Sequence, residues 1–162
     1  MLFVALQGDE MTHALNLVLP LKKDAETKAK LKALGEVFPN GIQQKIGEAL
    51  AKSKLVHFAR VLVIGEDYIC VLTEYEGPHK EYTEFFREEL SDVFAQIFAL
   101  AEGAPAVNDP QQFWEFSKSC NRRSLGTAED GATDMEGNPS GWLFSAYQFK
   151  TVPEIQTALD IA

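Results

Sequence analysis

The chain has 162 residues, of which 46% are hydrophobic and 24% are charged. That is the length and composition of one globular domain, and it excludes a disordered, collagen-like or disulfide-stapled chain. With 15 Lys and Arg against 24 Asp and Glu, the formal net charge is −9. Such a surface repels phosphate backbones and anionic lipids, so we expect neither nucleic acid nor a membrane as a partner.

The sequence has no apolar segment of the length that targeting or membrane insertion needs. Residues 1–6 are apolar but too few for a signal peptide, and no later stretch reaches about 18 consecutive apolar residues. The two cysteines, Cys70 and Cys120, form no Cys-x-x-Cys pair, and Cys70 lies in an apolar segment where a reduced thiol is usual. We therefore expect a cytoplasmic protein.

The first predicted elements are a strand and two helices. Leucines alternate along 14–20, which places them on one face of a strand. Asp24 stands where it can cap a helix over 25–34. After a turn rich in Pro and Gly, apolar residues at helical spacing predict a second helix over 42–53.

A β-hairpin is predicted next. Segments 55–64 and 68–75 are rich in β-branched and aromatic residues, and only Gly65-Glu66-Asp67 separates them. Both strands are apolar on both faces, so each face of the sheet needs a cover. Helices can cover one face, and a second subunit is the economical cover for the other. The pattern therefore predicts a homodimer.

The second half of the chain predicts three helices and a last strand. An apolar stripe at helical spacing predicts a long helix over 78–103, packed against the sheet. A shorter helix over 111–119 precedes a polar, glycine-rich loop over 126–141, which we expect to be mobile. A strand over 143–149 and a helix over 153–161 end the chain.

This order of elements is that of the β-α-β-β-α-β ferredoxin-like unit. We therefore predict a single α+β domain over residues 1–162, with an antiparallel ferredoxin-like sheet and helices on one face. Two copies that pair sheet to sheet would form a dimeric α+β barrel.

The candidate ligand-binding residues are polar side chains on the predicted strands: Asn16, His57, Arg60, Glu74, Tyr75 and Tyr147. An unpaired buried guanidinium is costly, so Arg60 needs a partner. Glu74 on the neighbouring strand is the natural one, and a bound anion is the alternative. For His57, a hydrogen-bonded position in the core is favoured over a role as ligand or base.

No metal site and no catalytic residue are predicted from the residues alone. Glu74, Glu76 and His79 fall within six residues, but their spacing matches no zinc pattern. The acidic loop over 126–141 lacks the frame of a calcium-binding loop. The sequence contains no nucleophile elbow, P-loop or G-x-G-x-x-G motif, so no reaction is assigned.

Three short strings carry a family resemblance: Val56-His-Phe-Ala-Arg60; Glu74-Tyr-Glu-Gly77 followed by Tyr82 and Phe85; and Phe144-Ser-Ala-Tyr147 before Thr151-Val-Pro-Glu-Ile155. Together they resemble a family of bacterial proteins with the dimeric α+β barrel fold, over about residues 55–155. Glu76 stands where that family usually has aspartate, and Gln148 stands where a proline is expected.

The wider superfamily includes dye-decolourising peroxidases, chlorite dismutases and haem-degrading monooxygenases. The resemblance implies a ligand site between the helix layer and the sheet, or within the barrel. At such a site we expect Arg60 to take an anionic group and tyrosine hydroxyls to orient the ligand. The resemblance also implies haem-related or oxidoreductase chemistry, with His57 or His79 as the axial ligand if haem binds. The peroxidase string G-x-x-D-G is absent, so no catalytic residue is carried over. We expect a small-molecule-binding protein; the alternative is a non-enzymatic structural or interaction dimer with a solid core.

Overall fold

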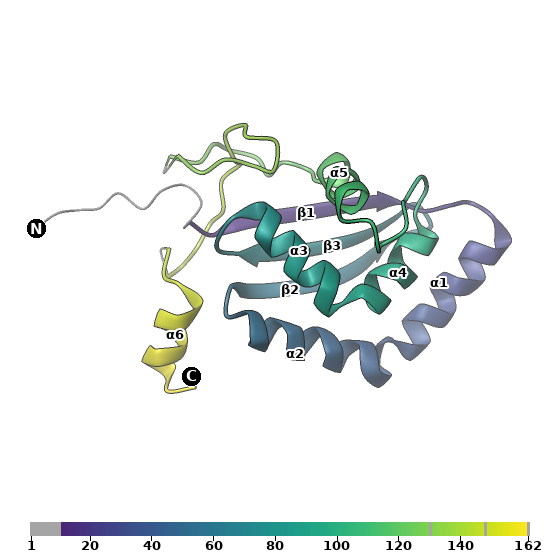
Figure 1. Ribbon diagram of the computed structural model, residues 1–162, viewed down its shortest axis with the longest axis horizontal. Coiled ribbons are helices and arrows are strands. Elements are labelled where there is room, and N and C mark those ends of the chain that lie inside the picture. Colours follow the sequence, from purple (N-terminus) through teal and green to yellow (C-terminus); the bar gives the residue numbers. More distant parts are fainter. Residues whose placement is uncertain (1–10, 130, 148, 162) are drawn as a thin grey trace, which may run out of the picture.

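The computed structural model describes residues 11–129, 131–147 and 149–161 (Figure 1). The apolar segment 1–6 and Gln148 lie outside the described residues. At the centre is an antiparallel sheet of three strands in the order β1-β3-β2. The strands are β1 (His13–Pro20), β2 (Val56–Ile64) and β3 (Tyr68–Tyr75). Their positions and the α+β class are as predicted from the sequence.

Alternation along β1 divides the sheet into two faces. Leu15, Leu17 and Leu19 are all at most 5% exposed, as the predicted shared face requires. The same face continues across the register through Ile69, Val71, Thr73 and Tyr75 of β3. Side chains from this face and from the helices above it form the hydrophobic core.

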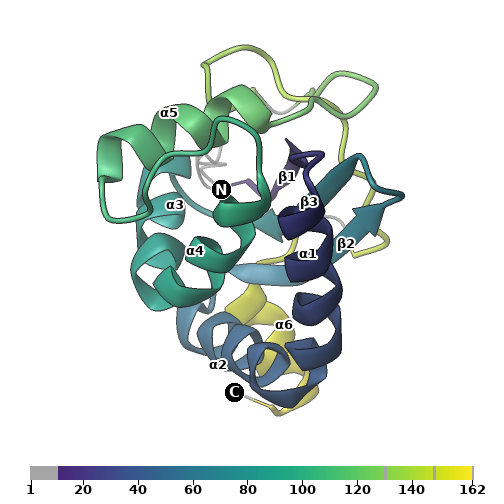
Figure 2. The same cartoon turned by 90° about the vertical axis from the view of Figure 1, so that its right-hand side faces the viewer.

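The helices follow the predicted order with shifted ends: α1 (Ala25–Val37), α2 (Gln43–Ser53), α3 (His79–Glu89), α4 (Ser91–Leu100), α5 (Pro110–Cys120) and α6 (Val152–Leu159). A short π-helical segment, η2 (Phe38–Ile42), joins α1 to α2. Figure 2 shows α3, α4 and α5 together on one side of the sheet. No helix among the described residues is long and apolar enough to span a lipid bilayer.

Local capping explains where several helices begin. The Asp24 carboxylate accepts from the backbone N–H of Thr27 at 2.8 Å, so the predicted cap of α1 is confirmed. Asp109 caps α5 in the same way. A capping box of Thr151 and Glu154 starts α6, which lies beyond the end of the sheet where β2 begins (Figure 1).

The long helix predicted over 78–103 is wrong as one element, because α3 and α4 are separated at Leu90. That residue has φ −121° and ψ 33°, outside the helical region. Ser91 and Asp92 follow, and both residue types favour helix starts over helix interiors. The bend still leaves Phe86, Leu90 and Val93 buried against the sheet.

The predicted last strand over 143–149 is also wrong: its described residues are irregular. The outer edge of β1 is instead taken by residues 121–124, at the end of α5. Leu17 and Asn121 form an isolated antiparallel bridge, and the Arg122 N–H donates to the Asn16 carbonyl at 2.8 Å. The middle of the outer edge of β1 is therefore paired with the segment that follows α5, and the described residues of 143–149 do not pair with it.

Candidate functional site

An apolar cavity of about 290 Å³ lies between the sheet and helices α2, α3 and α4. We call it the helix–sheet cavity. Aliphatic and aromatic side chains supply most of its wall, among them Ile46 of α2, Val71 of β3, Phe86 of α3 and Ile97 of α4. Its volume is close to the lower end of the range for small-molecule sites.

The mouth of the helix–sheet cavity lies between α2 and β2, the edge strand of the described sheet. Gln43, Gly47 and Arg60 line the cavity and are exposed to solvent, whereas its other lining residues are buried or half-buried. A Cβ added at Gly47 would meet no other atom within 4 Å. The glycine therefore keeps this opening wide.

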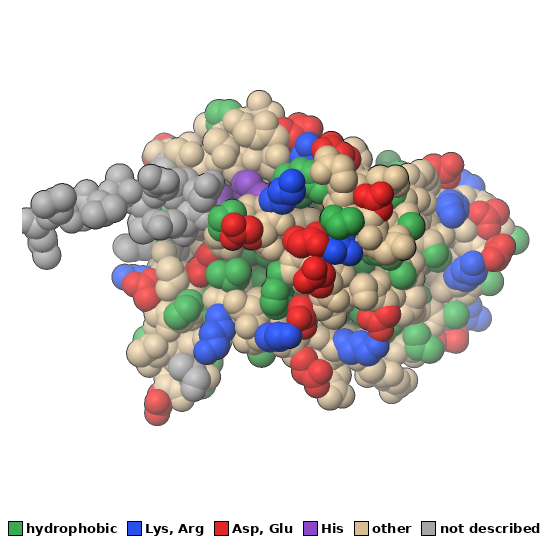
Figure 3. Space-filling model, in the orientation of Figure 1, with side chains coloured by type: hydrophobic (Ala, Val, Ile, Leu, Met, Phe, Trp, Pro, Cys, Tyr) green, Lys and Arg blue, Asp and Glu red, His purple; other side chains and the backbone are tan. Residues whose placement is uncertain are grey.

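Ion pairs join α2 to the neighbouring helices. Lys45 pairs with Asp92 of α4, and Lys52 pairs with Glu89 of α3 at 2.6 Å. Figure 3 shows charged and hydrophobic side chains interleaved on the face that carries these helices. These pairs are largely exposed, so we expect each to contribute little stability.

A β-bulge decides which β2 side chains face the cavity. Val56 pairs with Tyr75 and Phe58 pairs with Glu74, which leaves His57 as an extra residue. Beyond the bulge, Ala59 lies opposite Thr73 on the helix-facing side of the sheet. Two small side chains face each other there, and the space that they do not fill belongs to the cavity.

A pair of hydroxyl groups is the polar feature deep in the cavity wall. Thr73 Oγ1 and the Tyr82 hydroxyl are 2.7 Å apart and hydrogen-bonded, and both residues are buried. Burial raises the pKa of Tyr82 above its ordinary value, so the phenol keeps its proton at neutral pH. Of the other polar residues among the described lining residues, Gln43 is exposed at the mouth, and Arg60 borders the mouth from β2.

The Tyr82 ring is held in place by its aromatic neighbours. It stacks on Tyr75 with 3.7 Å between centroids and 4° between planes, and it lies 5.0 Å from the tilted Phe86 ring. Tyr75 lines a second, polar pocket, so the stacked tyrosines form a wall between that pocket and the helix–sheet cavity.

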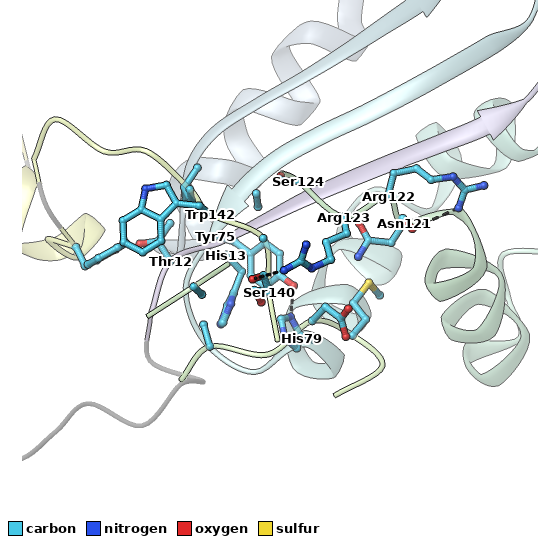
Figure 4. Close-up of a pocket in the computed structure, with 18 residues that line it drawn as sticks. Thr12, His13, Tyr75, His79, Asn121, Arg122, Arg123, Ser124, Ser140 and Trp142 are labelled. Atoms are coloured by element: carbon cyan, nitrogen blue, oxygen red, sulfur yellow. Dashed lines mark hydrogen bonds between the residues drawn. The ribbon is translucent and has the colours of Figure 1, made fainter. Parts of the chain in front are cut away.

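The polar pocket contains His13, Tyr75 and His79 and is covered by the loop after α5 (Figure 4). His79 Nε2 donates to the Thr133 carbonyl at 2.5 Å, which leaves Nδ1 of a neutral imidazole to accept from the Tyr75 hydroxyl. Arg123 Nε donates to the Pro139 carbonyl at 3.0 Å. The pocket has a volume of about 30 Å³, which is room for about one water molecule.

His57 and Glu76 form a buried polar contact at the end of the sheet. His57 Nε2 and the Glu76 carboxylate are 2.9 Å apart, and the same carboxylate oxygen accepts from the Val152 N–H at 2.9 Å. Burial raises the pKa of Glu76, while the Val152 and His57 contacts partly offset that rise. The contact attaches the start of α6 to the sheet, and it is separate from the cavity.

Two of the predicted ligand-binding residues adjoin the helix–sheet cavity. Arg60 borders its mouth, and Tyr75 stacks on the lining residue Tyr82. Asn16 is committed elsewhere, because its amide donates to the Arg122 carbonyl at 2.9 Å. Tyr147 is 69% exposed and lines none of the pockets described above. His57 serves the α6 contact.

The predicted ion pair between Arg60 and Glu74 is wrong: no such pair is found within 4 Å among the described residues. Arg60 lies opposite Leu72 in the register, so a diagonal step separates it from Glu74. Burial raises the pKa of Glu74, and the Arg60 charge offsets part of that rise across this gap.

Thr73 and Tyr82 are not among the ligand-binding residues predicted from the sequence. Tyr82 falls within the apolar stripe that predicts the helix over 78–103, and Thr73 follows an apolar run in the strand over 68–75. The available signal was their position. Both are hydroxyl residues within apolar patterns, and β-alternation places Thr73 on the same face as Val71 and Tyr75.

The described residues that line the helix–sheet cavity do not fit haem, because they include no histidine, cysteine or methionine. The Tyr82 hydroxyl is hydrogen-bonded to Thr73, and burial raises its pKa, so it does not supply a phenolate ligand. His79 uses both ring nitrogens within the polar pocket, and His57 Nε2 is bonded to Glu76. In the part of the chain that the structure describes, no cluster of three His, Cys, Asp or Glu is arranged to hold a metal ion.

Comparison with known proteins adds no relative: no protein-family model, curated protein or solved structure matches this chain. Membership of the dimeric α+β barrel family therefore stays a prediction from the three sequence strings.

Proposed function

We propose that this chain is a small-molecule-binding protein whose ligand occupies the helix–sheet cavity. The observation that carries the proposal is an apolar space of about 290 Å³ inside the helix–sheet layer, with its mouth at Gly47. Protein interiors are normally close-packed, and unfilled apolar volume lowers stability. A cavity of about half this volume in another protein already binds benzene. A ligand that fills this space would restore the missing contacts.

The walls favour a compact, largely apolar ligand. Aliphatic and aromatic side chains offer dispersion contacts. Among the described lining residues Arg60 alone is of a charged type, and it alternates with Ala59 and Val61, so its side chain belongs to the opposite face of the sheet. The alternative of a solid-core interaction protein expects no space of this size. Haem is not part of the proposal, because the cavity wall has no His, Cys or Met to ligate its iron.

The proposal is tested by blocking the mouth. The probe is 2-isopropenylnaphthalene, titrated calorimetrically into wild type, Gly47→Phe and Gly47→Ala. Forcing a phenyl group into the opening should weaken binding about tenfold to a hundredfold, the equivalent of an overpacking cost of about 1–3 kcal/mol. Gly47→Ala is the matched control, because its Cβ enters open space. Absence of binding to wild type, or equal affinity in Gly47→Phe, would contradict the proposal.

The opposite face of the sheet supports a second proposal, that two copies pair sheet to sheet as in a dimeric α+β barrel. Phe58, Ile64 and Tyr68 are 66%, 50% and 41% exposed there, which is unusual for large apolar side chains grouped on one face. Arg60 and Glu74 share this face and form no ion pair with another described residue. A two-fold axis between two copies would bring these opposite charges within reach of each other.

This pairing is tested by light scattering coupled to size-exclusion chromatography. We expect a dimer for wild type and a monomer for Phe58→Glu, because a buried unpaired carboxylate is costly. Leu125→Glu is the control, since Leu125 is 91% exposed in the loop after α5 and belongs to neither β2 nor β3. A monomeric wild type would contradict sheet-to-sheet pairing without affecting the cavity proposal.

A further inference from the structure

The Thr73–Tyr82 pair has one more hydrogen-bond donor than it uses. Each hydroxyl carries a single hydrogen, and the contact between them consumes one, whichever oxygen donates. Neither hydroxyl has a further hydrogen-bond partner among the described residues. One O–H in the wall of the cavity is therefore left to donate.

The position of this donor is restricted. Thr73 is fixed by its ladder in β3, and the Tyr82 ring is clamped between Tyr75 and Phe86. Both hydroxyl residues contribute to the cavity wall. A donor held in this way loses little conformational freedom when it meets an acceptor, so it can select among ligands of equal size.

The surroundings of the donor favour an uncharged acceptor. Among the described lining residues Arg60 alone is of a charged type, and its place between Ala59 and Val61 in β2 turns its side chain to the opposite face of the sheet. A charged ligand group placed beside Thr73 and Tyr82 would lose its hydration without gaining an opposite charge. A neutral oxygen has a much smaller hydration free energy to lose, and it gains the unused O–H.

We infer that the ligand of the helix–sheet cavity is an apolar molecule with a neutral hydrogen-bond acceptor, of the ketone, ester or amide class, whose oxygen accepts from the Thr73–Tyr82 hydroxyl pair. This rests on the proposed function, and it adds the chemical class and the orientation of the ligand. The carbonyl end lies against β3 and α3, and the apolar body extends toward α2 and the mouth.

The test compares two probes of the same shape. 2-Acetylnaphthalene carries a carbonyl where 2-isopropenylnaphthalene carries a CH₂ group, so only the first can accept a hydrogen bond. We expect wild type to bind the ketone at least about threefold more tightly than the alkene. This ratio is taken after correction for the difference between the two probes in their free energy of transfer from water to hydrocarbon. Equal corrected affinities would overturn this inference and leave the proposed function intact. Failure of both probes to bind would overturn both.

Variants locate the preference in the hydroxyl pair. Thr73→Val together with Tyr82→Phe should bind both probes with equal corrected affinity, whereas either single variant keeps one O–H and should keep the preference. Tyr75→Phe is the matched control, because it removes a buried hydroxyl on the far side of the stacked rings. A preference that survives the double variant, or disappears in Tyr75→Phe, would overturn the assignment.

A second measurement uses only wild type, so it remains valid if the double variant does not fold. With ¹³C at the carbonyl of 2-acetylnaphthalene, hydrogen bonding in wild type should move the bound signal downfield of its position in a hydrocarbon solvent. A bound signal at the hydrocarbon position would mean that the carbonyl accepts no hydrogen bond, and it would overturn the inference.

Discussion

The two pockets on either side of the stacked tyrosines differ in how their polar groups are used. The polar pocket is richer in residues associated with catalysis, including His13, His79 and Arg123, yet it holds only about 30 Å³. Protein partners occupy both His79 nitrogens. The helix–sheet cavity has about 290 Å³ and one unused O–H in its wall.

The difference teaches that a pocket has room for a ligand when it has unfilled volume and hydrogen-bonding groups that are not already bonded within the protein. The number of histidines and arginines near a pocket is a poorer guide. In the polar pocket, His79 connects Tyr75 at the end of the sheet to Thr133, and Arg123 donates to the Pro139 carbonyl, so both side chains have a structural role. In the helix–sheet cavity, a few hydroxyl and apolar side chains leave space and a donor. Four predictions test this comparison.

The largest effect is expected from removing the shared wall. Tyr75→Ala should lower the free energy of unfolding by about 3–5 kcal/mol, because it deletes a fully buried aromatic ring that packs against both pockets. Urea unfolding measures the loss. Tyr147→Ala, at a 69% exposed tyrosine, should change stability by less than about 0.5 kcal/mol. Similar losses in the two variants would mean that the wall is not a structural element.

A smaller effect is expected from disturbing only the polar pocket. A Cβ at Gly141 would lie 2.1 Å from the Ser124 carbonyl oxygen, so Gly141→Ala must displace backbone and should cost about 1–3 kcal/mol. The control is Gly35→Ala in α1, where the added Cβ meets nothing within 4 Å and should stabilise by up to about 1 kcal/mol. If Gly141→Ala also changed naphthalene binding, the two pockets would be coupled rather than independent.

The hydroxyl of Tyr75 should matter for stability and not for binding. Tyr75→Phe keeps the stacked ring but removes the donor to His79 Nδ1, so unfolding should become easier by about 0.5–1.5 kcal/mol. Its affinity for both naphthalene probes should match that of wild type. The prediction fails if calorimetry shows that this variant discriminates between ketone and alkene differently from wild type.

Glu76 offers a pH-dependent contrast with the neutral hydroxyl pair. Its pKa is raised by burial, so the folded protein binds its proton more tightly than the unfolded chain does. The stability of wild type relative to Glu76→Gln should therefore fall as pH rises from below the ordinary value of 4.5 through the raised pKa, and then level off. Urea unfolding of both proteins between pH 4 and 8 measures this difference. A difference that rises with pH would contradict the direction of the shift.

Local patterns were sufficient to predict much of the fold. Alternating leucines placed β1, β-branched residues placed the hairpin, and Asp24 placed the start of α1. These features depend on neighbours a few residues apart, which a sequence shows directly. The break at Leu90 and the loss of the predicted strand over 143–149 depend on contacts with distant segments. Periodicity does not report such contacts.

The candidate site was less predictable from local sequence patterns than the fold was. Arg60 and Tyr75 were singled out as polar residues on strands, but the hydroxyl pair was not. Thr73 and Tyr82 come from β3 and α3, and each becomes informative only when the other is seen 2.7 Å away. The bulge at His57, which turns Ala59 toward them, has no signature in the residue types of β2.

The sequence by itself determined the α+β class, the hairpin, most helix positions and the apolar face of β1, because each follows from propensity and periodicity within one segment. Only the tertiary structure decided where the cavity lies. The helix–sheet cavity is a deficit of side-chain volume that Gly47, Ala59 and Thr73 share across α2, β2 and β3. A small residue in one segment makes space only where the other segments fail to fill it, and that depends on how the layers pack.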